Sequence, residues 1–445
     1  FFVVSFMRSA ATVPSSWTRS DDVEESQCCV TMENIYAAAK RIEGGIVRSS
    51  CRRSRNLSAL TGCDIFLKAE YMQNTGSFKE RGALNSILQL PINQRKKGII
   101  AASAGNHALA LAYHGGRLNV PVTVVMPIYA PQTKVANCKS LGANVIAFGS
   151  SFTDATTHAR ELAEKYELTY IHGFDHPPVI AGQGSVGLEI LEQQPDIDAV
   201  FVPVGGGGLI AGLALAIKSI NPDIDIIGVE PVSFPSLIAA LYENEPVELE
   251  QPSSSTIADG LAVKCVGANV VPLCRQFVDR VVTVEEHYIA LSVLRMIELE
   301  KAVVEGAGAA GLAPLLAGMF PEYKGKKVCL VTCGGNIDVT LLGRVIDHGL
   351  AADGRLVRFR GKISDKPGGL AKFCDVVGRS GSTIRQIFHD RTFQGDDFSM
   401  VRVEVTVCTV NQEQAEELLV KFNEAGFPTQ MLDFMPHPAN KQQAQ

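Results

Sequence analysis

The apolar residues of this chain follow two kinds of pattern, and the change comes near residue 349. Before it, short continuous apolar runs alternate with stretches in which apolar residues recur at helical spacing. Continuous runs indicate strands that are buried on both faces, so this part predicts a parallel α/β fold. We expect strands at 64–70, 98–102, 121–127, 144–148, 198–204, 225–230 and 327–332, with helices at 33–42, 81–90, 107–113, 132–141 and 154–166.

Beyond residue 349 polar and apolar residues alternate, which is typical of strands with one buried face. We expect strands at 355–363, 383–389, 398–407 and 427–432, and helices at 367–377 and from Asn411, with Gln414 completing a capping-box-like start. The order βαββαβ predicts a separate small domain at 355–435, after a main domain at 32–349. Residues 1–31 and 436–445 are expected to be a disordered extension and a disordered tail.

Composition narrows the class of protein. The chain is 46% hydrophobic and 20% charged with a net charge of −6, which is ordinary for a globular protein and argues against nucleic-acid binding. No apolar run reaches about 18 residues, so we expect no membrane span. The 11 cysteines lack metal-ligand spacing, which favours reduced thiols and the cytoplasm. A mitochondrial presequence at 8–20 remains the alternative, although the acids at 21–25 favour a non-targeting extension.

One lysine stands in an unusual setting. Lys79 follows Phe78 and lies between an expected strand and an expected helix. Most lysines are surface residues, but the positive end of a helix dipole and an aromatic neighbour both disfavour the ammonium form. A lysine that loses its proton near neutral pH can form a Schiff base with a carbonyl compound. The question is whether the chain also supplies a site for a carbonyl cofactor.

A run of four glycines, Gly205, Gly206, Gly207 and Gly208, follows an expected strand and opens a helix at Leu209. Its backbone N–H groups can converge on an anion at the helix N-terminus. The alternative is a flexible surface loop, which this strand–helix context makes less favoured. The run is neither a dinucleotide fingerprint nor a P-loop, so we expect it to hold a single phosphate group.

The segment Ser103, Ala104, Gly105, Asn106 and His107 also joins an expected strand to a helix. Its backbone donors suit a second anion such as a substrate carboxylate, and the Asn106 amide suits a phenolic oxygen. For His107 we favour a satisfied histidine at a helix start over a catalytic role.

Two further residues are ambiguous. A buried cysteine usually serves packing, but Cys333 ends an expected strand and precedes two glycines, where it could face a ligand. Glu305 lies among small residues and would be costly to bury unless paired, so its role at the site is left open.

Taken together, these stretches resemble one family. Ser77–Lys79, 103–107, 181–184, 205–208, 305–308 and 333–336 resemble the motifs of fold-type II pyridoxal-phosphate enzymes, specifically the threonine/serine dehydratases (threonine ammonia-lyases), with serine racemase as a close relative. The resemblance covers about residues 33–349. It implies a tryptophan synthase β-like α/β fold of two parallel-sheet lobes, the small lobe at about 100–178 being inserted in the large one. The last domain resembles an ACT-type amino-acid-sensing domain.

The resemblance also implies a role for each candidate residue. Lys79 would form the Schiff base with pyridoxal 5′-phosphate, Phe78 would pack beside the ring, and Asn106 would bond its O3′. The glycines 205–208 with Leu209 would cradle the phosphate, Glu305 would line the cofactor site, and Cys333 would meet the pyridine nitrogen. Residues Ser103 to His107 would take the substrate carboxylate.

The implied reaction is α,β-elimination. A neutral thiol cannot hold the ring nitrogen protonated as an aspartate would, which favours loss of a β-hydroxyl over transamination. Lys79 would remove the α-proton of L-threonine or L-serine, giving 2-oxobutyrate or pyruvate and ammonium. Racemisation needs a second acid/base. The resemblance implies that serine racemases have a serine for this role, at the position where this chain has Ala104. Serine racemase, a β-replacing synthase and an inactive amino-acid sensor remain alternatives.

Metal and effector sites are weaker expectations. Glu230 matches a divalent-cation ligand of the racemases, but Ser236 stands where a carboxylate would be needed, so we expect no metal. At the first turn of the ACT-like domain, Asp365, Gly368, Gly369 and Leu370 are the expected contacts of an amino-acid effector such as isoleucine or valine. Because such domains pair between subunits, we expect a homodimer or homotetramer, with no nucleic-acid or membrane partner.

Overall fold

The computed structural model describes residues 9–20, 29–250, 255–390 and 399–432. The chain divides into two compact units, Phe1–Val339 and Thr340–Gln445. Nearly all of helix α15 (Val339–Ala352) therefore lies in the second unit, whereas the sequence predicted a main domain that extends to residue 349. Each unit is described by itself.

The first unit contains a seven-stranded sheet in the order β1-β10-β9-β8-β11-β3-β2. Its five central strands run parallel, and the edge strands β1 and β2 are antiparallel to their neighbours. Strand β8 is buried along its whole length, as its continuous apolar run predicted. The strands are β1 (Ser16–Thr18), β2 (Cys51–Arg53), β3 (Asp64–Lys68), β8 (Ala199–Pro203), β9 (Asp225–Pro231), β10 (Arg280–Val284) and β11 (Lys327–Val331).

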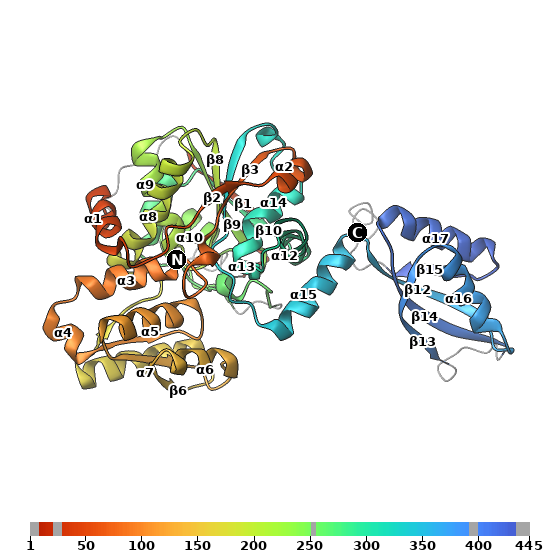
Figure 1. Cartoon of the computed structure of the whole chain (residues 1–445), viewed down its shortest axis with the longest axis horizontal. Helices are drawn as coiled ribbons and strands as arrows, with labels where there is room; N and C mark the ends of the chain where they lie inside the picture. The colour runs from red at the N-terminus through yellow and green to blue at the C-terminus, as the bar shows by residue number, and fades with distance from the viewer. Residues whose placement is uncertain (1–8, 21–28, 251–254, 391–398, 433–445) are drawn as a thin grey trace. The chain divides into compact units, whose positions relative to one another are not determined.

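A second sheet of the same unit has four parallel strands in the order β6-β5-β4-β7, namely β4 (Ile99–Ala102), β5 (Val122–Met126), β6 (Asn144–Ala147) and β7 (Thr169–Tyr170). Helices α5 (Asn106–Leu118) and α6 (Gln132–Ser140) share one apolar core with one face of this sheet. Helix α7 (Phe152–Tyr166) packs its alanines on the other face, and Figure 1 shows these helices around the small sheet.

The remaining helices of the first unit surround and connect the sheets. They are α1 (Met32–Ile42), α2 (Arg55–Thr61), α3 (Lys79–Gln89), α4 (Ile92–Lys97), α8 (Pro177–Gln193), α9 (Gly208–Ile220), α10 (Ser236–Glu243), α11 (Val270–Phe277), α12 (Glu286–Glu300), α13 (Gly306–Ala309) and α14 (Ala313–Leu316). Short 3₁₀ turns lie at Glu70–Met72, Asp259–Leu261, Ala310–Leu312 and Pro321–Tyr323. In the described residues, no helix is both long and apolar enough to cross a membrane.

Four strands were not foreseen: β1, β2, β7 and β10. Strands β1, β2 and β7 have only two or three residues, too few for a pattern of apolar positions. Strand β1 lies in the extension that was expected to be disordered. It pairs with β10 and buries Trp17, so that expectation does not hold for Ser16–Thr18. Residues 1–8, 21–28 and 436–445 lie outside the described residues.

The second unit has the predicted order βαββαβ: β12 (Leu356–Ser364), α16 (Gly369–Arg379), β13 (Thr383–Asp390), β14 (Met400–Cys408), α17 (Gln412–Glu424) and β15 (Thr429–Leu432). The sheet is antiparallel in the order β13-β14-β12-β15. Alternate residues of β12 and β14 share a core with α16 and α17, centred on Phe373 and Phe422. Asn411 caps α17 by accepting a hydrogen bond from the Gln414 N–H at 2.9 Å. The predicted fold class, an α/β protein with parallel sheets and a small antiparallel C-terminal unit, is confirmed.

Candidate active site

Lys79 is the first residue of helix α3, as the sequence predicted. The preceding residue, Phe78, donates its backbone N–H to the Cys333 carbonyl oxygen at 3.1 Å, which ties the helix start to the end of the central strand β11. The Lys79 Nζ atom lies 5.1 Å from the centre of the Phe78 ring and donates a 2.6 Å hydrogen bond to the Gly173 carbonyl oxygen. The amine is therefore held against the segment that follows β7.

The surroundings of Lys79 favour the neutral amine. Burial lowers the pKa of Lys79 from its usual 10.5 to about 8, against the opposing effects of the thiol of Cys333 and the carboxyl group of Glu305. The dominant cause is desolvation, which agrees with the expectation of a lysine that can act as a nucleophile or base near neutral pH.

A chain of side-chain hydrogen bonds runs beside Lys79. Asn106, at the start of α5, donates to Glu305 Oε1 at 2.7 Å and accepts from Asn336 at 2.9 Å. The same Asn336 amide donates to the Thr75 carbonyl oxygen at 2.7 Å. Residues far apart in the sequence are thereby joined, and the amide of Asn106 is held in one orientation.

Two groups next to this chain stay neutral more easily than usual. Burial, helped by the nearby Asp259, raises the pKa of Glu305 to about 7. Burial and the charge of Glu305 raise the pKa of the Cys333 thiol well above its usual range. The Cys333 side chain is therefore held as a neutral thiol.

The glycine run forms a tight turn between β8 and α9. Gly207 has φ +83°, a conformation that favours glycine, and α9 begins at the next residue. A Cβ atom on Gly206 would lie 2.2 Å from the Phe174 ring. Phe174 follows Gly173, whose carbonyl oxygen accepts from Lys79, so the glycine turn and the lysine contact the same short segment.

The segment before Lys79 contains two buried hydroxyl groups without a hydrogen-bond partner among the described residues. Ser77 is fully buried, and neither its Oγ nor Thr75 Oγ1 has a hydrogen-bond partner within the described part of the chain. Buried hydroxyls are normally satisfied, so these two fit a polar ligand. With the glycine turn for a phosphate and the neutral-prone Lys79 for an aldehyde, the residues fit pyridoxal phosphate.

The segment Ser103 to His107, which was expected to bind a second anion, lies where α5 begins. Asn106 reaches the site, whereas the Ser103 hydroxyl accepts from the Gly105 N–H at 3.3 Å and Ala104 packs against the small-sheet core. His107 Nε2 lies 3.1 Å from the Ile171 carbonyl oxygen, and burial lowers the pKa of His107 to about 3. Since a carbonyl only accepts, the neutral ring donates from Nε2, in keeping with the structural role favoured for it.

A buried ionic cluster supports the helix behind Lys79. Arg81 is fully buried and donates through Nε and Nη2 to both oxygens of Glu70, at 2.8 and 2.7 Å. It also donates to both oxygens of Glu189, which in turn accepts from Lys68 at 2.6 Å. These charges lower the pKa of Glu70 despite its complete burial. The cluster therefore links Arg81, two residues after Lys79, to the 3₁₀ turn Glu70–Met72 and to helix α8.

Glu230 lies outside this site. Its two carboxylate oxygens accept the backbone N–H groups of Leu237 and Ile238, at 2.7 and 3.1 Å, and so satisfy the start of α10. Burial raises the pKa of Glu230 to about 8. Among the described residues, no group of three or more acidic, histidine or cysteine side chains is arranged to hold a metal ion.

The expected effector residues all belong to the second unit. Gly368 has φ +86° and precedes α16, Gly369 begins it, and Leu370 packs on the core of that unit. Asp365 donates its N–H to the Ser399 carbonyl oxygen at 3.0 Å.

The sequence alone did not indicate three groups that contact the site residues: the Gly173 carbonyl, the Phe174 ring and the Asn336 amide. Asn336 belongs to the motif at 333–336, but no role was predicted for it. The segment 171–176 follows β7, a strand of two residues, so no strand pattern drew attention to it. Its His-Gly-Phe-Asp composition before a proline-started helix was the signal available.

Comparison with known proteins identifies the family. A family model described as "Pyridoxal-phosphate dependent enzyme" matches residues 42–334. The L-threonine ammonia-lyase of Thermotoga maritima is 41% identical over 389 residues, which are 87% of this chain and 96% of that protein. This chain therefore belongs to the pyridoxal-phosphate dependent enzymes, as its motifs indicated, and its cofactor is pyridoxal 5′-phosphate.

Solved structures agree with this placement. The processed form of threonine deaminase isoform 2 from Solanum lycopersicum has a TM-score of 0.67 and 35% identity, over 74% of this chain and 93% of that one. Serine racemase from Dictyostelium discoideum has a TM-score of 0.66 and 35% identity, over 70% and 99%.

Proposed function

We propose that this protein is an L-threonine ammonia-lyase that also accepts L-serine, converting them to 2-oxobutyrate or pyruvate and ammonium by α,β-elimination. The observation that carries the proposal is Lys79, a partly buried lysine of lowered pKa near the Cys333 thiol, with a glycine turn at the start of α9. The high identity to a threonine ammonia-lyase over most of both chains supports it.

Different residues of the chain have different roles in the proposed reaction. When bound, pyridoxal phosphate supplies the electron sink for the negative charge that develops at the substrate Cα. The glycine turn Gly205–Gly208, with Leu209, would hold the phosphate at the start of α9. Phe78 would pack beside the ring, Asn106 would donate to its phenolic oxygen, and Cys333 would meet the ring nitrogen as a neutral thiol.

Lys79 moves the proton. Its amine, neutral in a substantial fraction near pH 8, takes the proton from the substrate Cα. The segment Ser103 to His107 binds the substrate carboxylate, and Glu305 holds the Asn106 amide in place. In net terms the Cα hydrogen and the β-hydroxyl leave as water, and one water is taken up again when the nitrogen is released, so threonine yields 2-oxobutyrate and ammonium without net water.

Serine racemase is the second candidate, because a serine racemase shares the fold at 35% identity. Racemisation needs a proton donor on the face of the substrate opposite Lys79. Ala104 carries no transferable proton, so the residues favour the lyase.

The test is a steady-state comparison of two products. Purified enzyme should form 2-oxobutyrate from L-threonine, and the Lys79→Ala variant should lose this activity while keeping its circular dichroism spectrum. D-Serine formed from L-serine faster than pyruvate would contradict the lyase proposal. A protein that binds pyridoxal phosphate but turns over neither substrate would favour the inactive sensor.

We further propose regulation by an amino acid such as isoleucine or valine in the second unit, through Asp365, Gly368, Gly369 and Leu370, and assembly as a homodimer or homotetramer in the cytoplasm. Activity that is unchanged by these amino acids would contradict the regulatory part. Sedimentation of the holoenzyme measures the number of subunits.

A further inference from the structure

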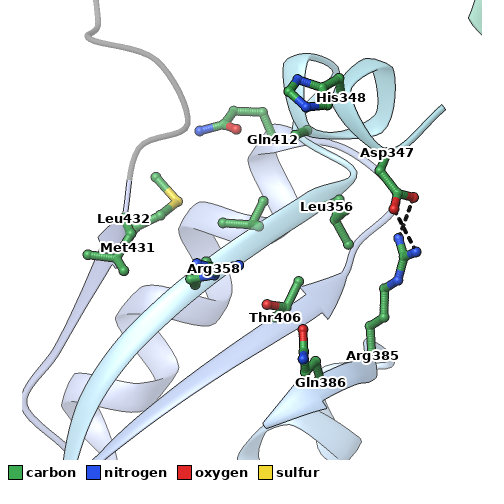
Figure 2. A pocket seen from close by; sticks show the side chains of 12 residues that line it. Asp347, His348, Leu356, Arg358, Arg385, Gln386, Thr406, Gln412, Met431 and Leu432 are labelled. Carbon is green, nitrogen blue, oxygen red and sulfur yellow. Dashed lines mark hydrogen bonds and ion pairs between the residues drawn. The ribbon is translucent and has the colours of Figure 1, made fainter. Parts of the chain in front are cut away.

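The second unit contains a cavity of about 490 Å³ that none of the proposed roles uses. It lies on the face of the four-stranded sheet opposite to α16 and α17, at the end of the sheet where β12 begins (Figure 2). The expected effector turn follows Ser364, at the other end of the same strand. The cavity is therefore a separate place in the unit.

One row of side chains across the sheet forms the floor of the cavity. In the strand register, Arg358 of β12 stands opposite Leu432 of β15 on one side and Thr406 of β14 on the other. Thr406 is in turn paired with Gln386 of β13. Directly paired residues of antiparallel strands point to the same face, so these four side chains line the floor together.

Helix α15 closes one side of the cavity. Strand β13 has a bulge between Ile384 and Gln386, and a bulge re-aims the extra residue, here Arg385. Arg385 donates to both oxygens of Asp347 on α15, at 2.7 and 2.9 Å, the paired contact drawn in Figure 2. Both ends of this ion pair are about 40% exposed, so it holds the helix only weakly.

The charges that line the cavity do not balance. Among the described residues of the lining, Asp347 is the only carboxylate, and both of its oxygens are already engaged by Arg385. Within the described residues, Arg358 makes no ion pair and no side-chain hydrogen bond. In the described part of the chain, the lining thus offers one uncommitted guanidinium and no uncommitted carboxylate, which favours an anion over a zwitterion.

The remaining lining is suited to a short apolar chain. Leu356 and Leu432 lie on the same face of the sheet as Arg358 and flank the guanidinium (Figure 2). The Thr406 hydroxyl and the Gln386 amide, neighbours in the floor, can donate to an uncharged oxygen. The volume is within the range of about 300–1,000 Å³ typical of small-molecule sites.

We propose that this cavity binds a small carboxylate with an apolar chain and no ammonium group, that is, a short-chain 2-oxo acid. Arg358 binds the carboxylate, Thr406 and Gln386 donate to the 2-oxo oxygen, and the apolar side chains cover the tail. An amino acid of the same skeleton binds less well, because its ammonium group finds no uncommitted carboxylate. If the proposed function holds, the ligand belongs to the chemical class of the reaction product, and only this last step rests on that function.

The test is isothermal titration of the full-length holoenzyme with 3-methyl-2-oxopentanoate and with L-isoleucine, which share a carbon skeleton. Comparison of the wild type with Arg358→Ala isolates the part of the binding that depends on this cavity. We expect the 2-oxo acid to bind at least about tenfold more weakly to Arg358→Ala, the loss of one charge-assisted hydrogen-bonding group. L-Isoleucine should show no comparable dependence on Arg358.

Lys362→Ala is the matched control. It removes one positive charge from the same face of β12, four residues further on and outside the cavity, so it should leave the binding unchanged. Circular dichroism and Tm of both variants exclude unfolding, which is not expected because Arg358 is exposed.

Three results would overturn the proposal: equal binding of the 2-oxo acid to Arg358→Ala and wild type, an Arg358-dependent site that prefers L-isoleucine, or a changed number of subunits in Arg358→Glu. The last would mean that this face of the sheet contacts a second copy of the chain. Because binding is measured without turnover, an enzyme that fails to convert threonine contradicts the proposed function and leaves this result unaffected.

Discussion

The lowered pKa of Lys79 has a direct kinetic consequence for cofactor attachment. Only the neutral amine attacks an aldehyde, so the rate at which apo-protein takes up pyridoxal phosphate follows the neutral fraction. At pH 7.5 a lysine of pKa about 8 is neutral in about a quarter of molecules, against about one in a thousand for the ordinary value of 10.5. The partly buried Lys79 should therefore react on the order of 200 times faster than an exposed lysine at this pH.

The assay follows the absorbance of the covalently attached cofactor, at about 410–420 nm, after apo-protein is mixed with pyridoxal phosphate. The rate should rise about tenfold per pH unit up to pH 8 and then level off, since deprotonation is complete above the pKa. N-acetyl-lysine amide, measured in parallel, is the control for ionisation of the cofactor itself. A protein rate that climbs together with the control up to pH 10 would refute the argument that burial activates Lys79.

Three further predictions concern the supports of the site. Gly206→Ala should weaken cofactor binding at least about tenfold, because the new Cβ would lie 2.2 Å from the Phe174 ring, and Phe174→Ala in the same chain should restore part of it. Arg81→Leu should lower the free energy of unfolding by about 3–5 kcal/mol, since it leaves the buried Glu70 unpaired, and Arg81→Leu with Glu70→Leu should be less destabilised. Glu305→Gln should raise the stability of the protein at pH 8 and leave it nearly unchanged at pH 4.5.

The sign of the Glu305 effect follows from its raised pKa. The folded state holds the proton up to about pH 7 and the unfolded state releases it near 4.5, so wild-type stability falls as pH rises between these values. The loss is at most about 3 kcal/mol, and Glu305→Gln removes it. Denaturant unfolding at the two pH values measures the difference. An equal stability difference at both would mean that Glu305 is an ordinary carboxylate.

The other two predictions have matched controls. Gly378→Ala adds a methyl group where nothing lies within 4 Å, so cofactor binding should stay unchanged. If Gly206→Ala binds the cofactor as well as Gly378→Ala does, the turn is not a phosphate cradle. For the ionic cluster, Arg379→Ala removes an exposed arginine that pairs with Asp375, and should cost under about 1 kcal/mol. A similar cost for Arg81→Leu, from urea unfolding, would contradict the account of the buried cluster.

Local pattern was enough for much of the fold. Continuous apolar runs predicted four of the five central strands, β10 being missed, and alternation predicted the C-terminal sheet. The start of α3 at Lys79 followed from the change of pattern around it. Strands of two or three residues, such as β1 and β7, were missed because their pairing partners, and not their own residues, define them.

In the candidate site, too, some features followed from the local sequence and others only from the tertiary structure. The sequence by itself determined the chemical groups: a lysine at a helix start, a glycine turn of phosphate size, a cysteine at a strand end and an asparagine before a helix. Only the tertiary structure decided the partners. Lys79 donates to a carbonyl 94 residues away, and Asn106 donates to a carboxylate 199 residues away. Likewise the bulge that aims Arg385 at Asp347 became visible only in the strand register. Such contacts depend on chain closure over long loops, and no local periodicity encodes the distance between two residues that far apart.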